Sequence, residues 1–349
     1  MVRRNTQLAI LAFILFVWAY IFLFSKGSEN NLDTNERETF DRFGTPRDNQ
    51  NELDEEGQPH DYQNELDEEG EDEDEDDEED YSFQYPADKK RKKRYPTVLI
   101  IGSQKSGTTS LRQFLKFHPD IVGPERELHY FDKTANGRNY EKYLKKMPKS
   151  YSNQITIEKT PNYFTVQKSP GLVLEYQKFL VVELKLILIV RDPIRRSISH
   201  AFHSKAHGRT ELKNLTTEIL AEKSKYIYSS LFGQHFERWL KYFRRDQFLV
   251  LDGEKFAKEN PTSALKEVEN FLGIKHAFKE EDFGFNDDKG FYCYNPTKFC
   301  FPSNRGHAAY PQQLTPAAKT ILKGIFEKDL ETFWRLAGVN YNWTLGADV

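Results

Sequence analysis

The feature that most constrains this chain is a strand, a glycine loop and a helix start in succession, within residues 96–117 (PTVLIIGSQKSGTTSLRQFLKF). An apolar, β-branched run over residues 98–101 predicts a buried strand that stops at Gly102. A small polar loop follows, and apolar residues at helical spacing begin after Thr109. This order of elements typically cradles a phosphate group, because the loop and the helix start present backbone N–H groups.

The position of the lysine distinguishes this loop from a Walker A loop. Gly102 and Gly107 have the Walker A spacing, but Thr108 stands where Walker A has its lysine, and the lysine here is Lys105. Nucleoside triphosphatases need their lysine on the β- and γ-phosphates and a hydroxyl group on Mg²⁺. The displaced lysine therefore predicts a different phosphate donor, used without a metal ion.

The N-terminal sequence predicts a membrane anchor. Residues 8–24 (LAILAFILFVWAYIFLF) are uninterrupted apolar residues, at the short end of the range of about 17–25 for a membrane span. A cleavable signal peptide is the alternative, but the run is long for one and no small-residue cleavage site follows. Arg3 and Arg4 place residues 1–7 in the cytoplasm and the rest of the chain in the lumen. So short a span suits the thinner membranes of the early secretory pathway.

Residues 25–94 are expected to form a disordered stem. Residues 25–88 contain 26 acidic and 4 basic residues, a net charge of −22, with few aliphatic side chains. The stem is either a spacer or a polyanion mimic that competes with substrate for a basic domain. It ends in the basic run KKRKKR, residues 89–94. That run can be the start of a polyanion groove, a convertase cleavage site after Arg94, or a solvated run that balances the stem.

Residues 95–349 predict one globular α/β domain, P-loop-like, with a mostly parallel central sheet flanked by helices. Buried strands are predicted at residues 98–101, 155–158, 184–190 and 248–251. Helices are predicted at residues 109–117, 140–146, 172–179, 235–242, 262–271 and 316–336. From residue 89 onward there are 44 basic and 28 acidic residues, a net charge of +16. Such a charge predicts a polyanionic partner: nucleic acid, anionic lipid or acidic polysaccharide.

A second phosphate site is predicted within residues 184–200 (LKLILIVRDPIRRSISH). A buried strand ends before Arg191, and Asp192-Pro193 leads into a helix that carries Ser199. An arginine at the end of a strand can clamp a phosphate, and a helical serine can add a hydroxyl group. An Arg–Asp surface pair at a helix start is the alternative. Two phosphate sites on neighbouring strand ends would suit a nucleotide with two separate phosphates.

Cysteines and sequons fit a luminal domain. Cys293 and Cys300 are the only cysteines, and in a luminal compartment so close a pair predicts a local disulfide. Zinc is not expected, because no second Cys/His pair lies at ligand spacing. Asn214 and Asn342 begin the sequons NLT and NWT, which are expected to be glycosylated.

These motifs together resemble a known family. The GxxKxGTT loop and the later RDP-x5-S element are similar to the two phosphate-binding elements of sulfotransferases, which use 3′-phosphoadenosine 5′-phosphosulfate (PAPS). The wider pattern is similar to heparan sulfate sulfotransferases, both the glucosaminyl 3-O-sulfotransferases and the N-sulfotransferase domains. The motifs that carry it are residues 125–132 (ERELHYFD), 157–163 (IEKTPNY), 237–243 (ERWLKYF) and 289–293 (KGFYC) with Cys300. The resemblance covers about residues 96–343.

The resemblance implies a role for each matching residue. It implies that the 5′-phosphosulfate is held by Lys105, Ser106, Gly107, Thr108 and Thr109. The 3′-phosphate would be held by Arg191 and Ser199, and Tyr292 would pack on the adenine. A segment after the second cysteine would close over the nucleotide: Arg305, Gly306, His307, Ala308 and Ala309. A Cys293–Cys300 disulfide would pin the hairpin there, and Lys105 would stabilise the charge on the bridging oxygen.

Glu127 is the candidate general base, because a carboxylate in reach can take the proton of a poorly nucleophilic sugar hydroxyl. We expect the basicity of Glu127 to be raised, which would make it an efficient base, and to be tuned by His129 and Asp132. Beside Arg126, Glu127 could also be a solvated loop carboxylate. Lys159 is expected to contact the acceptor or the sulfonate, or else to pair with Glu158 or another carboxylate.

The resemblance, the anchor and the charge together predict a single-pass type II Golgi enzyme. We expect PAPS-dependent, metal-free transfer of a sulfuryl group to heparan sulfate, at the glucosamine 3-OH, with no nucleic-acid partner. Gln104 stands where 3-O-sulfotransferases have arginine, Ser106 replaces a glycine and His307 replaces an arginine. Gln104, Asp132 and Lys159 are expected to face the acceptor.

Other functions compete with this one. An N-sulfotransferase, another carbohydrate or tyrosylprotein sulfotransferase, and a catalytically silent polysaccharide-binding protein are the alternatives. A P-loop kinase is disfavoured, because no Mg²⁺-binding carboxylate is recognised on the neighbouring strand ends. The oligomeric state does not follow from the sequence.

Overall fold

The computed structural model describes residues 90–133, 139–180, 182–222, 224–302 and 313–347. The predicted membrane span, residues 25–89 of the predicted stem and the closing segment from Arg305 to Ala309 lie outside these residues. Residues 90–94, the end of the predicted stem, are described. Within the described residues, no helix is both long and apolar enough to span a membrane.

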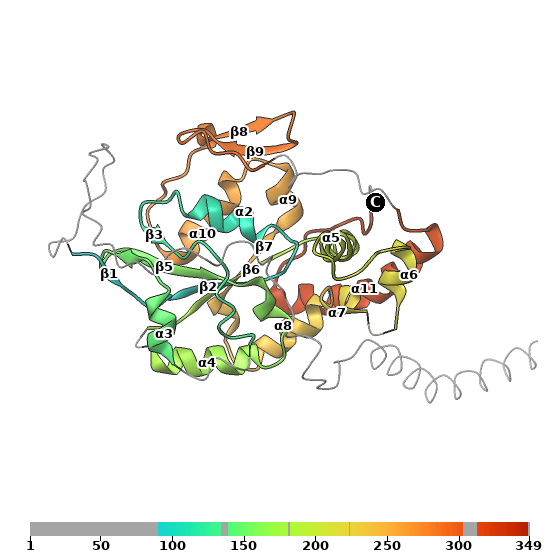
Figure 1. The fold of residues 1–349 in the computed structure, drawn as a ribbon, viewed down its shortest axis with the longest axis horizontal. Helices are drawn as coiled ribbons and strands as arrows, with labels where there is room; N and C mark the ends of the chain where they lie inside the picture. Colours follow the sequence, from blue (N-terminus) through green and yellow to red (C-terminus); the bar gives the residue numbers. More distant parts are fainter. Residues whose placement is uncertain (1–89, 134–138, 181, 223, 303–312, 348–349) are drawn as a thin grey trace, which may run out of the picture.

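A five-stranded, wholly parallel sheet forms the centre of the domain, in the order β3-β5-β2-β6-β7 (Figure 1). Its strands are β2 (Val98–Gly102), β3 (Ile121–Val122), β5 (Ile155–Lys159), β6 (Lys185–Val190) and β7 (Phe248–Asp252). The predicted strands are thus confirmed, and β3 adds an edge strand too short to recognise in the sequence. Because all five strands are parallel, their carboxyl ends meet along one edge, where a ligand site is expected.

Helices cover both faces of the sheet (Figure 1). The longer helices are α2 (Thr108–Leu115), α4 (Ser169–Phe179), α5 (Pro193–Ala206), α8 (Phe232–Leu240), α10 (Thr262–Leu272) and α11 (Pro316–Ala337). The shorter ones are α3 (Tyr140–Lys145), α6 (Leu215–Leu220), α7 (Lys225–Tyr228), α9 (Gly253–Lys258) and the 3₁₀ helices Pro161–Phe164, Arg245–Gln247 and Glu280–Asp282. All six helices that the periodicity predicts are present. Pro170 lies in the first turn of α4, which therefore starts before the predicted Leu172.

The alternation of side chains along the strands builds two hydrophobic cores. Leu99 and Ile101 point into the core shared with α4, α5, α8 and α11, whereas Val98 and Ile100 point into the core shared with α2 and α10. Strand β6 divides its side chains in the same way. Such strands are buried on both faces, which explains why they read as continuous apolar runs rather than alternating ones.

Two small antiparallel pairs accompany the main sheet. β8 (Phe283–Asn286) and β9 (Phe291–Tyr294) form a hairpin on the side of α2 and α9 (Figure 1). β1 (Lys92–Lys93) pairs with β4 (Lys149–Ser150), so the end of the basic run takes part in strand pairing. The guanidinium of Arg94 also donates to the carbonyl of Ser150. This pairing joins residues far apart in the sequence, and no local pattern predicts it.

Candidate active site

The glycine loop lies where β2 ends and α2 begins. The N–H of Ser103 donates to the carbonyl of Ile189 on β6, at 2.7 Å, and the hydroxyl oxygens of Ser103 and Ser106 are 2.6 Å apart. Gly107 has a φ of 106°, a conformation that disfavours a side chain, and it precedes α2 without any side-chain cap. The first N–H groups of α2 are therefore available to an anion.

Two arginines from one motif donate hydrogen bonds to backbone carbonyls of the loop. Arg191 donates to the carbonyl of Lys105 at 3.3 Å, and Arg196 donates to the carbonyl of Gln104 at 3.1 Å. Arg191 also donates to Glu254 on α9 at 2.9 Å. Arg191 thus pairs with Glu254 and not with Asp192, which was the alternative prediction. Asp192 instead caps α5 by accepting from the N–H of Ile194 at 2.7 Å. The second predicted phosphate site thus lies directly beside the first.

Arg196 is a site residue that the sequence did not single out. Its guanidinium is fully buried and donates to neutral groups: the Ser230 hydroxyl, the Tyr226 carbonyl, the Gln104 carbonyl and the His200 ring. Burial, with the nearby charge of Arg191, lowers its pKa to about 9. A buried cation among neutral partners favours a bound anion close by. The available signal was its place on the inward face of α5, four residues after the capping aspartate.

The predicted catalytic residues come together on the neighbouring strand end. Lys159, the last residue of β5, contacts the carboxylate of Glu127, and its Nζ lies 3.4 Å from the hydroxyl of Thr109 on α2. His129 Nε2 lies 3.4 Å from the other oxygen of Glu127, and its Nδ1 lies 2.7 Å from Asp132. Glu127 is therefore linked to the phosphate loop through Lys159, and it is not a solvated loop carboxylate.

The electrostatics of this cluster differ from the expected raised basicity. Burial alone would raise the pKa of Glu127, but hydrogen bonds from His129 and Lys159, with their positive charges, lower it to about 2. Burial would likewise lower the pKa of His129, but Asp132 and Glu127 raise it to about 10. At neutral pH the cluster thus holds an imidazolium between two carboxylates.

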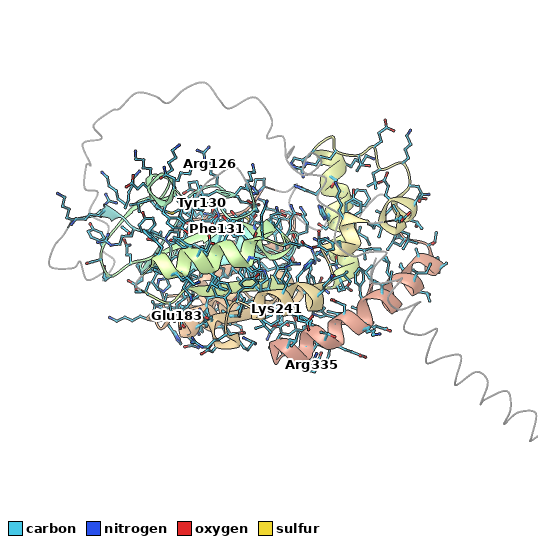
Figure 2. The ribbon with its side chains drawn as sticks, turned by 90° about the horizontal axis from the view of Figure 1, so that it is seen from below. Arg126, Tyr130, Phe131, Glu183, Lys241 and Arg335 are labelled. Carbon is cyan, nitrogen blue, oxygen red and sulfur yellow. A yellow bond between two sulfur atoms is a disulfide. The ribbon has the colours of Figure 1, made fainter. Side chains whose placement is uncertain are left out.

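Side chains of β5 and of the residue that follows it fix the backbone beside Glu127. The N–H of Leu128 donates to Glu158 at 3.4 Å, and the N–H of His129 donates to the hydroxyl of Thr160 at 3.3 Å. Thr160 in turn donates to Glu158 at 2.6 Å. His129 has a φ of 50°, the left-handed conformation that this anchoring holds in place. Figure 2 shows Arg126, Tyr130 and Phe131 of the same segment close together at one side of the domain.

Glu158 gives a prediction on stability. It is fully buried, and burial raises its pKa to about 7 against the opposing hydrogen bonds from Thr160 and Leu128. The folded state then holds a proton that the unfolded state releases near its ordinary pKa, so the free energy of unfolding falls as pH rises from about 4.5 to 7. Glu158→Gln should remove this loss, about 3 kcal/mol at most. Chemical denaturation at several pH values measures the slope.

A matched variant serves as the control for Glu158→Gln. Asp329 is also buried, and its pKa is also raised to about 7. Its carboxylate accepts from the N–H groups of Gly233 and Gln234 on α8, which are far from Glu127 in the sequence. Asp329→Asn should flatten the same slope without touching the segment of Glu127. An unchanged slope in Glu158→Gln would show that this carboxyl does not titrate in the window.

His203 on α5 responds to the charges of both halves of the site. Burial, and then the positive charge of Lys105, lower its pKa to about 4, while Glu127 acts in the opposite direction. Its neutral ring thus lies within electrostatic reach of both Lys105 and Glu127. Sequence reasoning missed His203, which belongs to none of the matched motifs.

The remaining predicted residues lie on the periphery of this centre. Tyr292 on β9 is half-buried, with its ring edge against Phe285, and the predicted Cys293–Cys300 disulfide is present and joins β9 to the segment after it. Ser199 is half-buried on α5. Of the sequon residues, both exposed, Asn214 caps α6 and Asn342 lies after α11.

Comparison with known proteins identifies the class. The sulfotransferase domain model matches residues 95–333. A sulfotransferase from Alicyclobacillus acidocaldarius has a similar fold, with a TM-score of 0.56 and 18% identity, covering 71% of this chain and 97% of that one. The chain therefore belongs to the sulfotransferase family.

Curated relatives place it more closely. The human heparan sulfate glucosamine 3-O-sulfotransferase 5 is 35% identical over 71% of this chain and 74% of its own length. The mouse heparan sulfate glucosamine 3-O-sulfotransferase 3B1 is 30% identical over 72% of this chain and 65% of its own length. The predicted resemblance to the heparan sulfate sulfotransferases is thus confirmed.

Proposed function

We propose that this sulfotransferase transfers the sulfuryl group of PAPS to the 3-OH of glucosamine in heparan sulfate. The observation that carries the proposal is the chain of contacts Glu127–Lys159–Thr109, which puts a candidate base beside the helix start of the phosphate loop. The names of the curated relatives support the acceptor. The net charge of +16 from residue 89 onward independently supports an anionic acceptor.

The residues around the loop fit an anionic nucleotide. The start of α2 is uncapped, Arg196 is a buried cation with neutral partners, and Arg191 lies against the loop. In this proposal the loop residues Lys105 to Thr109 hold the 5′-phosphosulfate, while Arg191 and Ser199 hold the 3′-phosphate. Arg191 must then share its guanidinium between that phosphate and Glu254. Tyr292 packs on the adenine, and Arg305 to Ala309 close the site.

PAPS supplies an activated sulfuryl group, and this chain's residues would direct its transfer. Glu127 accepts the proton of the sugar hydroxyl as the hydroxyl oxygen bonds to sulfur. The bond from sulfur to the phosphate oxygen breaks, and Lys105 stabilises the negative charge that develops on that oxygen. An anion bound near Lys159 offsets its positive charge and so raises the pKa of Glu127 toward the value a base needs. Gln104, Asp132 and Lys159 face the acceptor.

The cellular setting is part of the proposal. Residues 8–24 anchor a type II protein in the Golgi membrane, the acidic residues that follow are its stem, and the catalytic domain lies in the lumen. The apolar run behind Arg3 and Arg4 supports this orientation. The Cys293–Cys300 disulfide suits an oxidising compartment, in which Asn214 and Asn342 become glycosylated.

Product mapping tests the function. The purified full-length protein is incubated with ³⁵S-labelled PAPS and heparan sulfate, and the labelled product is cleaved to disaccharides. We expect the label on 3-O-sulfated glucosamine, without added metal ion. Label found only as N-sulfate, or on chondroitin sulfate or peptide tyrosine, would contradict the acceptor. Heparin binding without any turnover would favour a silent polysaccharide-binding protein.

A further inference from the structure

The chain returns to the nucleotide side of the sheet after its last helix. The helix α11 ends at Ala337, with Gly338 as its C-cap, and residues 341–346, here called the C-terminal strap, run past the ends of β6 and β7. The strap makes three hydrogen bonds there. The Tyr341 hydroxyl donates to the Val250 carbonyl at 2.9 Å, Trp343 Nε1 to Asp252 at 3.1 Å, and the N–H of Gly346 to Asp192 at 2.6 Å.

Two of these acceptors are the caps of helices. Asp192 caps α5, and Asp252 caps α9 by accepting from the N–H of Glu254 at 2.9 Å and of Lys255 at 3.3 Å. Asp192 is buried and Asp252 is half-buried, and an incompletely satisfied carboxylate is costly away from water. The N–H of Gly346 donates to Oδ2 of Asp192, whose Oδ1 accepts from α5, and Trp343 adds a third donor to Oδ1 of Asp252. The strap therefore bonds directly to both capping carboxylates.

Both helix starts lie against the phosphate-binding residues. A Cβ on Gly253, the first residue of α9, would lie 2.5 Å from the carbonyl oxygen of Ser106, so α9 begins in direct contact with the loop. Glu254 follows it and holds the guanidinium of Arg191. Arg191 itself precedes the capping residue Asp192. If the cap of α5 shifted, Arg191 would move. If the cap of α9 shifted, the support behind Ser106 would move. Either change would alter the distance between Arg191 and the phosphate loop.

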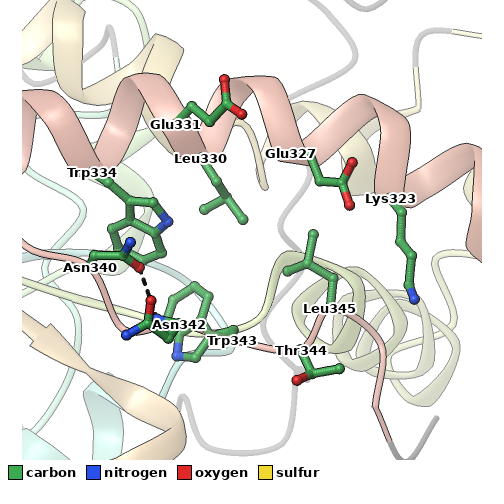
Figure 3. A pocket seen from close by; sticks show the side chains of 10 residues that line it. All are labelled: Lys323, Glu327, Leu330, Glu331, Trp334, Asn340, Asn342, Trp343, Thr344 and Leu345. Carbon is green, nitrogen blue, oxygen red and sulfur yellow. Dashed lines mark hydrogen bonds between the residues drawn. The ribbon is translucent and has the colours of Figure 1, made fainter.

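Aromatic packing fixes the strap on its other side. The ring centroids of Trp334 on α11 and Trp343 are 5.0 Å apart, and those of Trp334 and Tyr341 are 5.3 Å apart. Trp334 and Leu330 of α11, together with Trp343 and Leu345 of the strap, line a cavity of about 360 Å³, and Figure 3 shows the two tryptophans side by side at it. Because Trp343 packs with α11 and also donates to Asp252, it connects the last helix to the nucleotide side.

We propose that residues 343–346 of the C-terminal strap, which bond to the two capping aspartates, are a positioning element of the nucleotide site, and that Trp343 is its principal residue. By bonding to the capping aspartates of α5 and α9, these residues fix Arg191 and the support of Ser106 for an anionic adenosine nucleotide. This inference rests on the proposed function. It assigns Trp343 no contact with the nucleotide itself.

A pair of conservative variants tests the strap. Trp343→Phe removes the hydrogen bond to Asp252 and keeps an aromatic ring, whereas Tyr341→Phe removes the bond to Val250, which is no cap. Both leave Asn342 and Thr344 in place. We expect Trp343→Phe to raise the Kd of 3′-phosphoadenosine 5′-phosphate (PAP) and the KM of PAPS about three- to tenfold, the scale of one hydrogen bond. The KM of heparan sulfate should stay unchanged, and Tyr341→Phe should bind PAP like the parent protein.

Calorimetric titration with PAP, the two KM values and thermal unfolding of both variants separate the outcomes. Equal PAP affinity in Trp343→Phe and the parent protein would overturn the proposed positioning role of the strap. An equal loss in Tyr341→Phe would also overturn it, because the effect would then be general loosening. A parent protein that does not bind PAP at all would instead overturn the proposed function, and the strap with it.

Discussion

Replacing Lys105 by alanine is expected to lower kcat by about 10²- to 10³-fold, the usual cost of removing one group that stabilises charge in the transition state. Lys105 lies in the loop with a φ of 70°, which turns its backbone toward Arg191, and its carbonyl accepts from that guanidinium. The backbone of the loop is therefore held without the ammonium group. PAP affinity should fall by much less than kcat, because the α2 start and Arg191 remain. Single-turnover kinetics and PAP titration measure the two effects.

A second lysine variant controls for the loss of charge. Lys241 follows α8 and is exposed, and in the view of Figure 2 it lies across the domain from Arg126. Lys241→Ala removes the same charge from the protein and should leave kcat unchanged. Heparin affinity should be retained in both variants. A Lys105→Ala protein with more than a tenth of the parental kcat would show that Lys105 does not stabilise the leaving group.

The sequence predicts the parallel core and the two phosphate-binding elements because both depend on local patterns. Strands buried on two faces are continuous apolar runs, and a strand that ends in a glycine loop before a helix can be read from one short segment. Glu127, His129 and Lys159 were singled out only through matched motifs. That they meet follows from the parallel pairing of β5 with β2, which brings the end of β5 beside α2.

Other parts of the site depend on contacts between distant segments. Glu254 becomes the partner of Arg191 only because β7 lies next to β6, and no pattern around residue 254 marks it. The low pKa of Glu127 is set by two cations at once, His129 in its own segment and Lys159 on β5. A local pattern offers only its neighbours along the chain, His129 and Asp132, as tuning groups. The strap likewise joins Trp343 to Asp252 across 91 residues.

Glu127→Gln is expected to lower kcat by about 10²- to 10⁴-fold, the range for loss of a general base. The amide keeps the size of the side chain but cannot accept the proton of the hydroxyl. Because the pKa of Glu127 is about 2, its carboxylate is fully ionised at neutral pH and repels a nearby anionic nucleotide. Its removal leaves the charges of Lys159 and His129 without this counter-charge. The Kd of PAP should therefore fall or stay unchanged while kcat collapses, and this opposite movement separates loss of a base from loss of structure.

Glu125 provides the matched control in the same segment. Glu125 lies two residues before Glu127, and its side chain is 76% exposed and pairs with Lys116. Glu125→Gln therefore removes an equal charge without touching the cluster. That variant should keep the parental kcat. If Glu127→Gln kept more than a tenth of the parental kcat, another group would have to accept the proton, and His203, whose low pKa keeps its ring neutral near Lys105 and Glu127, would be the residue to replace next. If Glu127→Gln lost PAP binding together with kcat, its carboxylate would be a structural partner of Lys159 and His129 rather than the base.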